Sequence, residues 1–194
     1  MKIMKRVGIY SGTFDPVHNG HVSFALQAID VAGLDEVVFL PEATPREKEG
    51  VTDISHRFEL LKRSIGPFSN LSVRMLEVEQ FCADDALPEL LDIFDGDELW
   101  MLLGSDVVRT FSYRWKNLDA IFRDMAMIIA VREGDNAKDI KKAFKNLHTK
   151  VKPRYAVIDS PLADVNSTRI RRGQVVRDIS AEALEYIQQH HLYK

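Results

Sequence analysis

The chain has 194 residues, of which 45% are hydrophobic and 28% are charged, and its formal net charge is −3 at pH 7. These values are typical of a globular protein long enough to bury a core, so we expect one domain over residues 1–194. They argue against a general binder of nucleic acids or membranes, and the single cysteine, Cys82, excludes an internal disulfide and a cysteine-based zinc site.

The first residues carry no apolar stretch of the kind found in signal peptides. No run along the chain approaches the roughly 18 apolar residues of a membrane span. We therefore expect a cytoplasmic protein with no membrane partner. The composition leaves the oligomeric state open, a homo-oligomer included.

Apolar runs and amphipathic stretches alternate along the chain. The predicted strands cover residues 7–11, 36–41, 71–78, 99–103, 125–131 and 155–159. The predicted helices cover residues 21–31, 53–65, 84–94, 118–122, 135–148, 167–172 and 180–191, and the polar segment 41–52 is predicted to be a loop. This alternation, with long gaps between strands, is typical of an α/β protein with a doubly wound parallel sheet.

In such a sheet, ligands bind beyond the carboxyl ends of the strands, where the strand order reverses. Four segments follow predicted strands at that edge and carry polar or glycine residues. They cover residues 11–21, 41–52, 104–106 and 160–171. The sequence therefore predicts that the chemistry converges on one edge of the sheet.

The segment after the first strand holds two histidines, His18 and His21, at the predicted start of a helix. A helix N-terminus already favours an anion through its unpaired N–H groups and its dipole. Two imidazoles added there can hold and polarise phosphate, which indicates an enzyme that handles nucleotides. The alternative is that one histidine caps the helix and the other packs. The pair lacks the neighbouring cysteine or H-E-x-x-H arrangement of zinc sites, so no protein-held metal is predicted.

The turn before the histidines adds further candidates for phosphate binding. Gly12 allows a tight backbone whose N–H groups, with those of Thr13 and Phe14, can face a phosphate. A phenylalanine such as Phe14 is more often a packing residue than a functional one. Asp15 is expected either to orient a histidine or to order the turn before Pro16.

A second basic segment, residues 167–171, lies near the C-terminus. Ser167 or Thr168 is predicted to cap a short helix, and one hydroxyl with a following guanidinium, from Arg169 or Arg171, can bind outer phosphates. The alternative is a solvated basic helix.

Three further groups are weaker candidates. Asp106 follows the strand 99–103 and is expected to bind a ribose or order water around a cation, to cap the next helix, or to do both. Trp115 can stack on a base or simply pack in the core. Arg46 and Lys48 lie in the predicted loop 41–52, which should swing over the site.

Taken together, these blocks resemble the nicotinate-nucleotide adenylyltransferases, within the wider group of nucleotidyltransferases that carry an H-x-G-H motif. Residues 12–21 (GTFDPVHNGH) match the family's first motif nearly letter for letter, and residues 104–106 match its G-[AS]-D. Residues 115–119 (WKNLD) resemble its tryptophan-centred segment, and residues 166–171 (NSTRIR) resemble its S-S-T-x-I-R motif.

The resemblance implies a Rossmann-like fold and a transfer of the adenylyl group of ATP, with Mg²⁺, to a pyridine mononucleotide. It implies that His18 and His21 hold the ATP phosphates and that Ser167, Thr168 and Arg171 bind the phosphate tail. The partners would then be ATP and a phosphorylated small acceptor.

The chain departs from the family pattern where the acceptor is expected. The family's Pro-Pro-His-Lys stretch is replaced by residues 43–48 (ATPREK), so Arg46 or Lys48 is expected to supply the missing phosphate ligand. The family's Tyr-Thr-x-Asp-Thr segment reads CADDA at residues 82–86. If Asp84 and Asp85 face the acceptor pocket, a carboxylated acceptor would be repelled by Asp84.

Two other functions stay open at this point. The first is adenylyl or cytidylyl transfer to a different phosphorylated acceptor. The second is a nucleotide-binding protein with little catalysis, against which the intact pair His18 and His21 argues.

Overall fold

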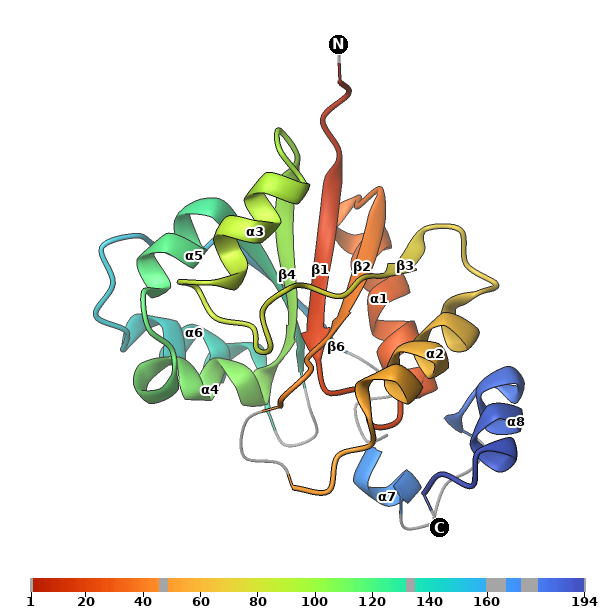
Figure 1. The fold of residues 1–194 in the computed structure, drawn as a ribbon. Coiled ribbons are helices and arrows are strands. Elements are labelled where there is room, and N and C mark those ends of the chain that lie inside the picture. Colours follow the sequence, from red (N-terminus) through yellow and green to blue (C-terminus); the bar gives the residue numbers. More distant parts are fainter. Residues whose placement is uncertain (1, 46–48, 132–134, 160–166, 172–177, 194) are drawn as a thin grey trace.

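The computed structural model describes residues 2–45, 49–131, 135–159, 167–171 and 178–193, and its centre is a six-stranded parallel sheet (Figure 1). The strand order is β3-β2-β1-β4-β5-β6. The strands are β1 (Arg6–Gly12), β2 (Glu36–Pro41), β3 (Leu71–Val73), β4 (Glu98–Gly104), β5 (Met125–Val131) and β6 (Tyr155–Asp159). The order reverses between β1 and β4, as expected for a doubly wound Rossmann-like sheet.

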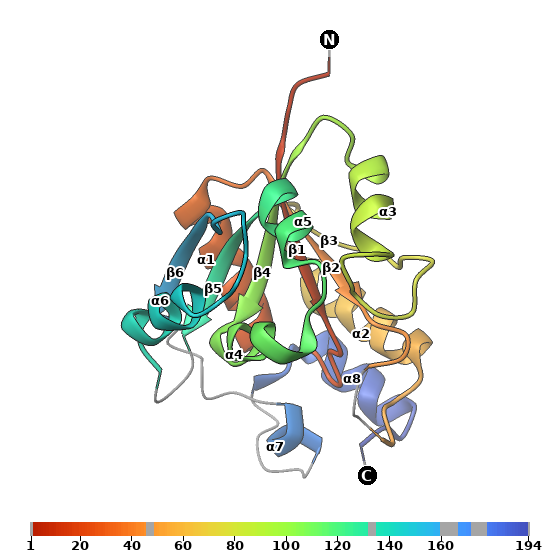
Figure 2. The same cartoon turned by 90° about the vertical axis from the view of Figure 1, so that its left-hand side faces the viewer.

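Helices cover both faces of this sheet (Figures 1 and 2). They are α1 (Asn19–Ala32), α2 (Ile54–Ile65), α3 (Ala86–Ile93), α4 (Ser105–Arg114), α5 (Leu118–Asp124), α6 (Ala137–Lys145), α7 (Ser167–Arg171) and α8 (Ala181–Gln189). Helices α1, α2, α7 and α8 contribute to one hydrophobic core, and α3 to α6 contribute to the other. Because the central strands are buried on both faces, they read as continuous apolar runs.

Alternate residues of one strand serve the two cores. On β4, Met101 and Leu103 face the core beneath α3 to α6, whereas Leu102 faces the core beneath α1 and α2. The same alternation holds on β5, where Ile128 and Ile129 belong to opposite cores. This period of two is what a strand requires of its sequence.

The predicted elements agree with the structure over most of the chain. The strands at residues 36–41, 125–131 and 155–159 have the predicted bounds. Helix α2 is capped by Asp53, whose carboxylate accepts the N–H of Ser55 at 2.8 Å. Strand β3 is shorter than predicted, and α4 has no counterpart among the predicted helix ranges.

The carboxyl ends of the strands meet at one edge, at the bottom of the view in Figure 1. The turn after β1, the start of α4 and the short helix α7 all lie at this edge. The N-terminus projects from the opposite end. Across the described ranges, no helix combines the length and the apolar character needed to cross a membrane.

Candidate active site

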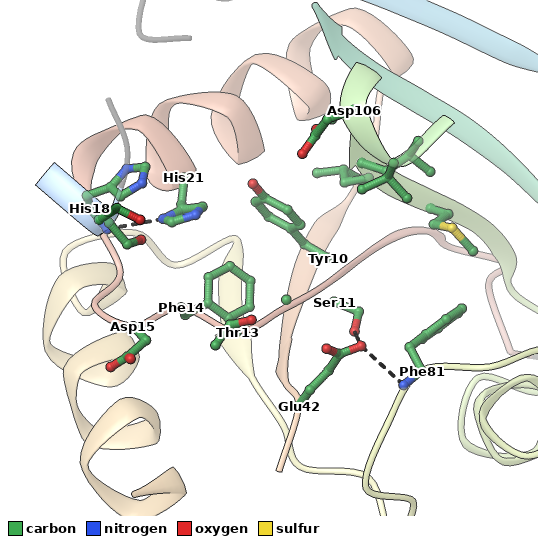
Figure 3. Close-up of a pocket in the computed structure, with 18 of the residues that line it drawn as sticks. Tyr10, Ser11, Thr13, Phe14, Asp15, His18, His21, Glu42, Phe81 and Asp106 are labelled. Atoms are coloured by element: carbon green, nitrogen blue, oxygen red, sulfur yellow. Dashed lines mark hydrogen bonds between the residues drawn. The ribbon is translucent and has the colours of Figure 1, made fainter. Parts of the chain in front are cut away.

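A cavity of about 400 Å³ opens at the carboxyl edge of the sheet (Figure 3). Its lining comes from the ends of β1, β2 and β4 and from α1, α4 and α7. The lining residues of the first half of the chain are Tyr10, Ser11, Gly12, Thr13, Phe14, Asp15, His18, His21, Glu42 and Phe81. Those of the second half are Met101, Leu102, Leu103, Gly104, Asp106, Val107, Trp115, Ser167, Thr168 and Arg171.

The turn after β1 is held in shape by aromatic packing. Phe14 has a left-handed backbone with φ of 48°, and its side chain is 2% exposed. Its ring meets those of Tyr10 and Phe39 edge-on, at centroid distances of 5.3 and 5.5 Å. A Cβ atom on Gly12 would lie 3.1 Å from this ring, so a larger residue there would force the Phe14 ring to shift. Phe14 therefore has the packing role that the sequence left open.

The two histidines lie together at the start of α1. Their rings stack with centroids 3.6 Å apart, and the backbone N–H of His18 donates to His21 Nδ1 at 3.2 Å. Because Nδ1 of His21 accepts a bond, the proton of the neutral ring sits on Nε2. His18 is the N-cap residue of α1 and also lines the cavity, so the capping and site interpretations hold together.

Helix α7 docks directly on the turn that leads to the histidines. The Ser167 hydroxyl donates to the carbonyl oxygen of Pro16 at 2.9 Å, across 151 positions of sequence. Arg171 Nη1 donates to the carbonyl oxygen of Asp15 at 2.5 Å, and its Nη2 donates to Thr168 Oγ1 at 3.2 Å. The structure thus brings the two basic segments to one cavity. Ser167 is the first residue of α7, and its hydroxyl is bonded to the turn.

Asp15 orders the turn rather than a histidine. Its side chain is buried at 3% exposure and accepts the phenol of Tyr193 at 2.7 Å and the N–H of Thr52 at 3.4 Å. Arg171 lies 4.0 Å from the same carboxylate. Asp15 therefore ties the C-terminal segment to the first motif.

Arg57 is a buried residue that bonds the segments around the cavity without lining it, and no motif in the sequence identifies it. It lies on α2 at 1% exposure and donates to the carbonyl oxygens of Thr52, Thr13 and Glu42 at 2.7 to 2.9 Å, and to that of Ala43 at 3.2 Å. Burial lowers the pKa of its guanidinium, while Asp15 and other nearby acidic groups oppose that shift. A signal existed, because Arg57 shares its helix face with the buried Leu60 and Leu61.

The far end of the cavity, away from the histidines, is aromatic and acidic (Figure 3). Phe81 and Trp115 line it with ring centroids 6.1 Å apart. Trp115 also packs on Phe111 at 5.1 Å, so its site and core interpretations hold together. Glu42 extends from the end of β2, and its Oε1 accepts the N–H of Phe81 at 3.2 Å. Glu42 is a second residue of the site that the sequence analysis did not propose as a ligand group.

Asp106 lines the cavity from the first turn of α4. The cap of this helix is Gly104, so the expectation that Asp106 itself caps the helix is wrong. A carboxylate in the first turn still complements the helix dipole.

Asp84 and Asp85 are placed outside the main cavity. They line a neighbouring cavity of about 380 Å³, and Phe81 and Trp115 line both cavities. Asp84 accepts a bond from the side-chain amide of Asn117 at 3.1 Å, and Asp85 accepts one from the thiol of Cys82 at 3.0 Å. Neither aspartate is therefore a lining residue of the cavity that holds the histidines.

Three basic candidates cannot be placed. Arg46 and Lys48 fall outside the described residues, and so does the side chain of Arg169. Within the described part of the chain, no three His, Cys, Asp or Glu side chains gather as a metal site would require.

Residues 9–173 match the model of the cytidylyltransferase-like family. The chain is 31% identical to a probable nicotinate-nucleotide adenylyltransferase of Clostridium perfringens over 173 residues, which cover 87% of this chain and 85% of that protein. It is 30% identical to one of Neisseria meningitidis serogroup A over 200 residues, which cover 98% and 100%. Its fold matches that of a Plasmodium falciparum nicotinic acid mononucleotide adenylyltransferase complexed with NaAD, with a TM-score of 0.78 at 20% identity over 97% of each chain.

Proposed function

The chain belongs to the cytidylyltransferase-like family and, within it, to the nicotinate-nucleotide adenylyltransferases, and from this premise we propose that it joins ATP to nicotinate mononucleotide in NAD biosynthesis. An oxygen of the acceptor phosphate forms a bond to the α-phosphorus of ATP. The bond from that phosphorus to the bridging oxygen breaks, and pyrophosphate leaves. The products are the dinucleotide and pyrophosphate, and nicotinamide mononucleotide is the alternative acceptor.

The observation that carries this proposal is the docking of α7 on the first motif. Ser167 and Arg171 bond the carbonyl oxygens of Pro16 and Asp15, so the cavity brings the imidazoles of His18 and His21 together with the Thr168 hydroxyl and the Arg171 guanidinium. Such a set matches a chain of phosphates, because each charge-assisted contact to phosphate contributes about 1.5–3 kcal/mol. A guanidinium has five N–H donors, so its two bonds orient Arg171 and leave donors for phosphate oxygens.

Each of these groups has a proposed role in the adenylyl transfer. We assign the Nε2–H of His21 as a donor to phosphate oxygens, with His18 beside it. The Thr168 hydroxyl and the Arg171 guanidinium hold the outer phosphates, which become the leaving pyrophosphate. The acceptor phosphate is itself the nucleophile, so the protein needs no covalent intermediate. Its work is to align two anions and to neutralise their repulsion.

Mg²⁺ is proposed to enter with ATP as part of the substrate. It is commonly held by substrate phosphates, waters and one or two carboxylates. Asp106 is the carboxylate that the cavity offers beside the helix start, and a ribose hydroxyl is its other proposed partner. The cytoplasmic location expected from the sequence belongs to the same proposal, since ATP is supplied inside cells.

The proposal is tested by mixing the protein with ATP, Mg²⁺ and nicotinate mononucleotide and measuring pyrophosphate. We expect one pyrophosphate for each dinucleotide formed, and none when the acceptor is left out. A panel of other phosphorylated acceptors tests the substrate class. Absence of turnover with both pyridine mononucleotides would reject the proposal, and ATP binding without pyrophosphate would favour a binding protein.

A further inference from the structure

The start of α4 is held by a bond to a residue outside the helix. Its N-cap residue is Gly104, which has no side chain that could accept the N–H groups of the first turn. The hydroxyl of Ser105, the first residue of α4, instead donates to Asp135 Oδ2 at 2.6 Å. Ser105 is 2% exposed, so this bond lies in the interior. The first turn of α4 is therefore fixed to a residue 30 positions further along the chain.

Asp135 comes from the segment that follows β5. Strands β4 and β5 are neighbours, and Gly104 lies opposite Ala130 at their carboxyl ends, so the two segments leave the sheet side by side. The side chain of Asp135 is 8% exposed and also forms an ion pair with Arg109. Ser105 and Arg109 are four positions apart and share one face of α4. Asp135 thus bonds that face at two points.

The residue that this arrangement places in the main cavity is Asp106. It directly follows Ser105 and lines the cavity, and Figure 3 shows its carboxylate directed toward Tyr10. Ser105 borders a different, small cavity between α4 and α6. Successive side chains of a helix point about 100° apart, so one can be held in the interior while the next faces a ligand. Fixing Ser105 therefore fixes the direction of Asp106.

We infer that Asp135 is a positioning residue that holds the start of α4 so that Asp106 keeps its place toward ATP. The inference rests on the proposed function, in which Asp106 binds the ribose or the Mg²⁺ that enters with ATP. Asp135 acts through the helix, because it borders the small cavity and not the main one. A carboxylate suits this role because bonds to a charged acceptor are shorter and stronger than neutral ones. A small displacement of a positioning group is enough to slow a transfer that depends on alignment.

The first test measures kcat/KM for ATP by pyrophosphate release, at saturating Mg²⁺ and nicotinate mononucleotide. We expect Asp135→Ala to lose at least about tenfold relative to wild type. Ser105→Ala removes the donor of the same bond and leaves the Arg109 pair, so it should lose about threefold or more. A folded Asp135→Ala protein within twofold of wild type would overturn the inference. If that variant does not fold, a value within twofold of wild type for Ser105→Ala would overturn it.

A double-mutant cycle with Asp106→Asn separates positioning from a general loss of stability. If Asp135 acts through Asp106, Asp135→Ala should cost less than about twofold in kcat/KM in the Asp106→Asn background. A role independent of Asp106 would give the full loss in both backgrounds and overturn the inference. An Asp106→Asn protein as active as wild type would overturn it as well.

Asp139→Asn is the matched control. Asp139 is an exposed carboxylate in the first turn of α6 and borders the same small cavity. We expect its kcat/KM for ATP to stay within twofold of wild type. A loss equal to that of Asp135→Ala would show a general effect of charge near α4 and overturn the specific role. Absence of turnover by the wild-type protein with both pyridine mononucleotides would reject the proposed function itself, which is a distinct outcome.

Discussion

Arg57 shows how a single buried charge can hold the walls of a site. Its guanidinium donates to four carbonyl oxygens, two in the segment that follows β2 and two in the segments before α1 and α2. The charge is retained because arginine keeps its proton even when burial lowers its pKa. Arg57 thus joins the turn after β1 to the segment that carries Glu42.

Replacing Arg57 should lower the free energy of unfolding of the protein. In Arg57→Met the carbonyl oxygens of Thr13, Thr52, Glu42 and Ala43 lose their donor in a buried place. We expect the free energy of unfolding to fall by about 3 kcal/mol or more, measured by urea denaturation. Lys62→Met on the same helix should change it by less than about 0.5 kcal/mol, because that side chain is exposed. Equal stability of the two variants would contradict the structural role of Arg57.

At the scale of single residues, the sequence identifies groups that carry their own local pattern. His18, His21 and Arg171 stand in short motifs at the predicted starts of helices, and the structure brings all three to one cavity. Arg57 and Glu42 stand in no such motif, and most of their partners are backbone groups of other segments. Local sequence does not encode those partners.

Helix α8 and the residues that follow it contact α2 and the turn before the histidines. Helix α8 packs on α2, where His56 Nδ1 lies 2.9 Å from the Tyr186 hydroxyl. The chain then continues to Tyr193, whose phenol donates to Asp15 in the turn before the histidines. The last residues of the fold therefore help to order its first motif.

Removing the Tyr193 hydroxyl should lower the free energy of unfolding, and the size of this loss should depend on pH. Burial raises the pKa of the Tyr193 phenol above its usual value of 10. The unfolded chain then releases this proton first, so the stabilisation is complete below pH 10 and is lost as the pH rises above it. We expect Tyr193→Phe to be less stable than wild type by about 1–2 kcal/mol near neutral pH. The difference should shrink above pH 10, as followed by denaturation at several pH values.

Tyr113→Phe is the control for this series, since Tyr113 is 69% exposed. It should match wild type near neutral pH. A Tyr193→Phe protein whose stability equals wild type at every pH would contradict the role given to the phenol.

At the scale of elements, the hydrophobic periodicity predicts most helices and strands, but it misses elements in which that pattern is weak. Helix α4 buries only Ser105, Val108 and Phe111, so its apolar stripe is narrow and includes a β-branched residue that favours a helix poorly. Strand β3 is shorter than the predicted strand because pairing with β2 extends only over Leu71–Val73. Pairing partners, which a local pattern does not contain, decide where an edge strand ends.

At the scale of the whole molecule, the parallel sheet explains why remote segments share one site. Carboxyl ends of parallel strands lie at the same edge, so segments after β1, β2, β4 and β6 converge there. This convergence was predicted from the order of strands and helices alone. The direct bonds from α7 to Pro16 and Asp15 were not, because they depend on how a short helix settles after the last strand.

The central claim is that the first motif and α7 hold one triphosphate together. The most direct test is steady-state pyrophosphate release by His18→Ala and Arg171→Ala, with ATP varied at saturating nicotinate mononucleotide. Each variant should lose at least about tenfold in kcat/KM for ATP, a change of roughly 1.4 kcal/mol in transition-state stabilisation. Arg154→Ala, which removes an exposed arginine paired with Glu98, should stay within twofold of wild type. Near-normal kinetics in either folded variant would contradict the shared site.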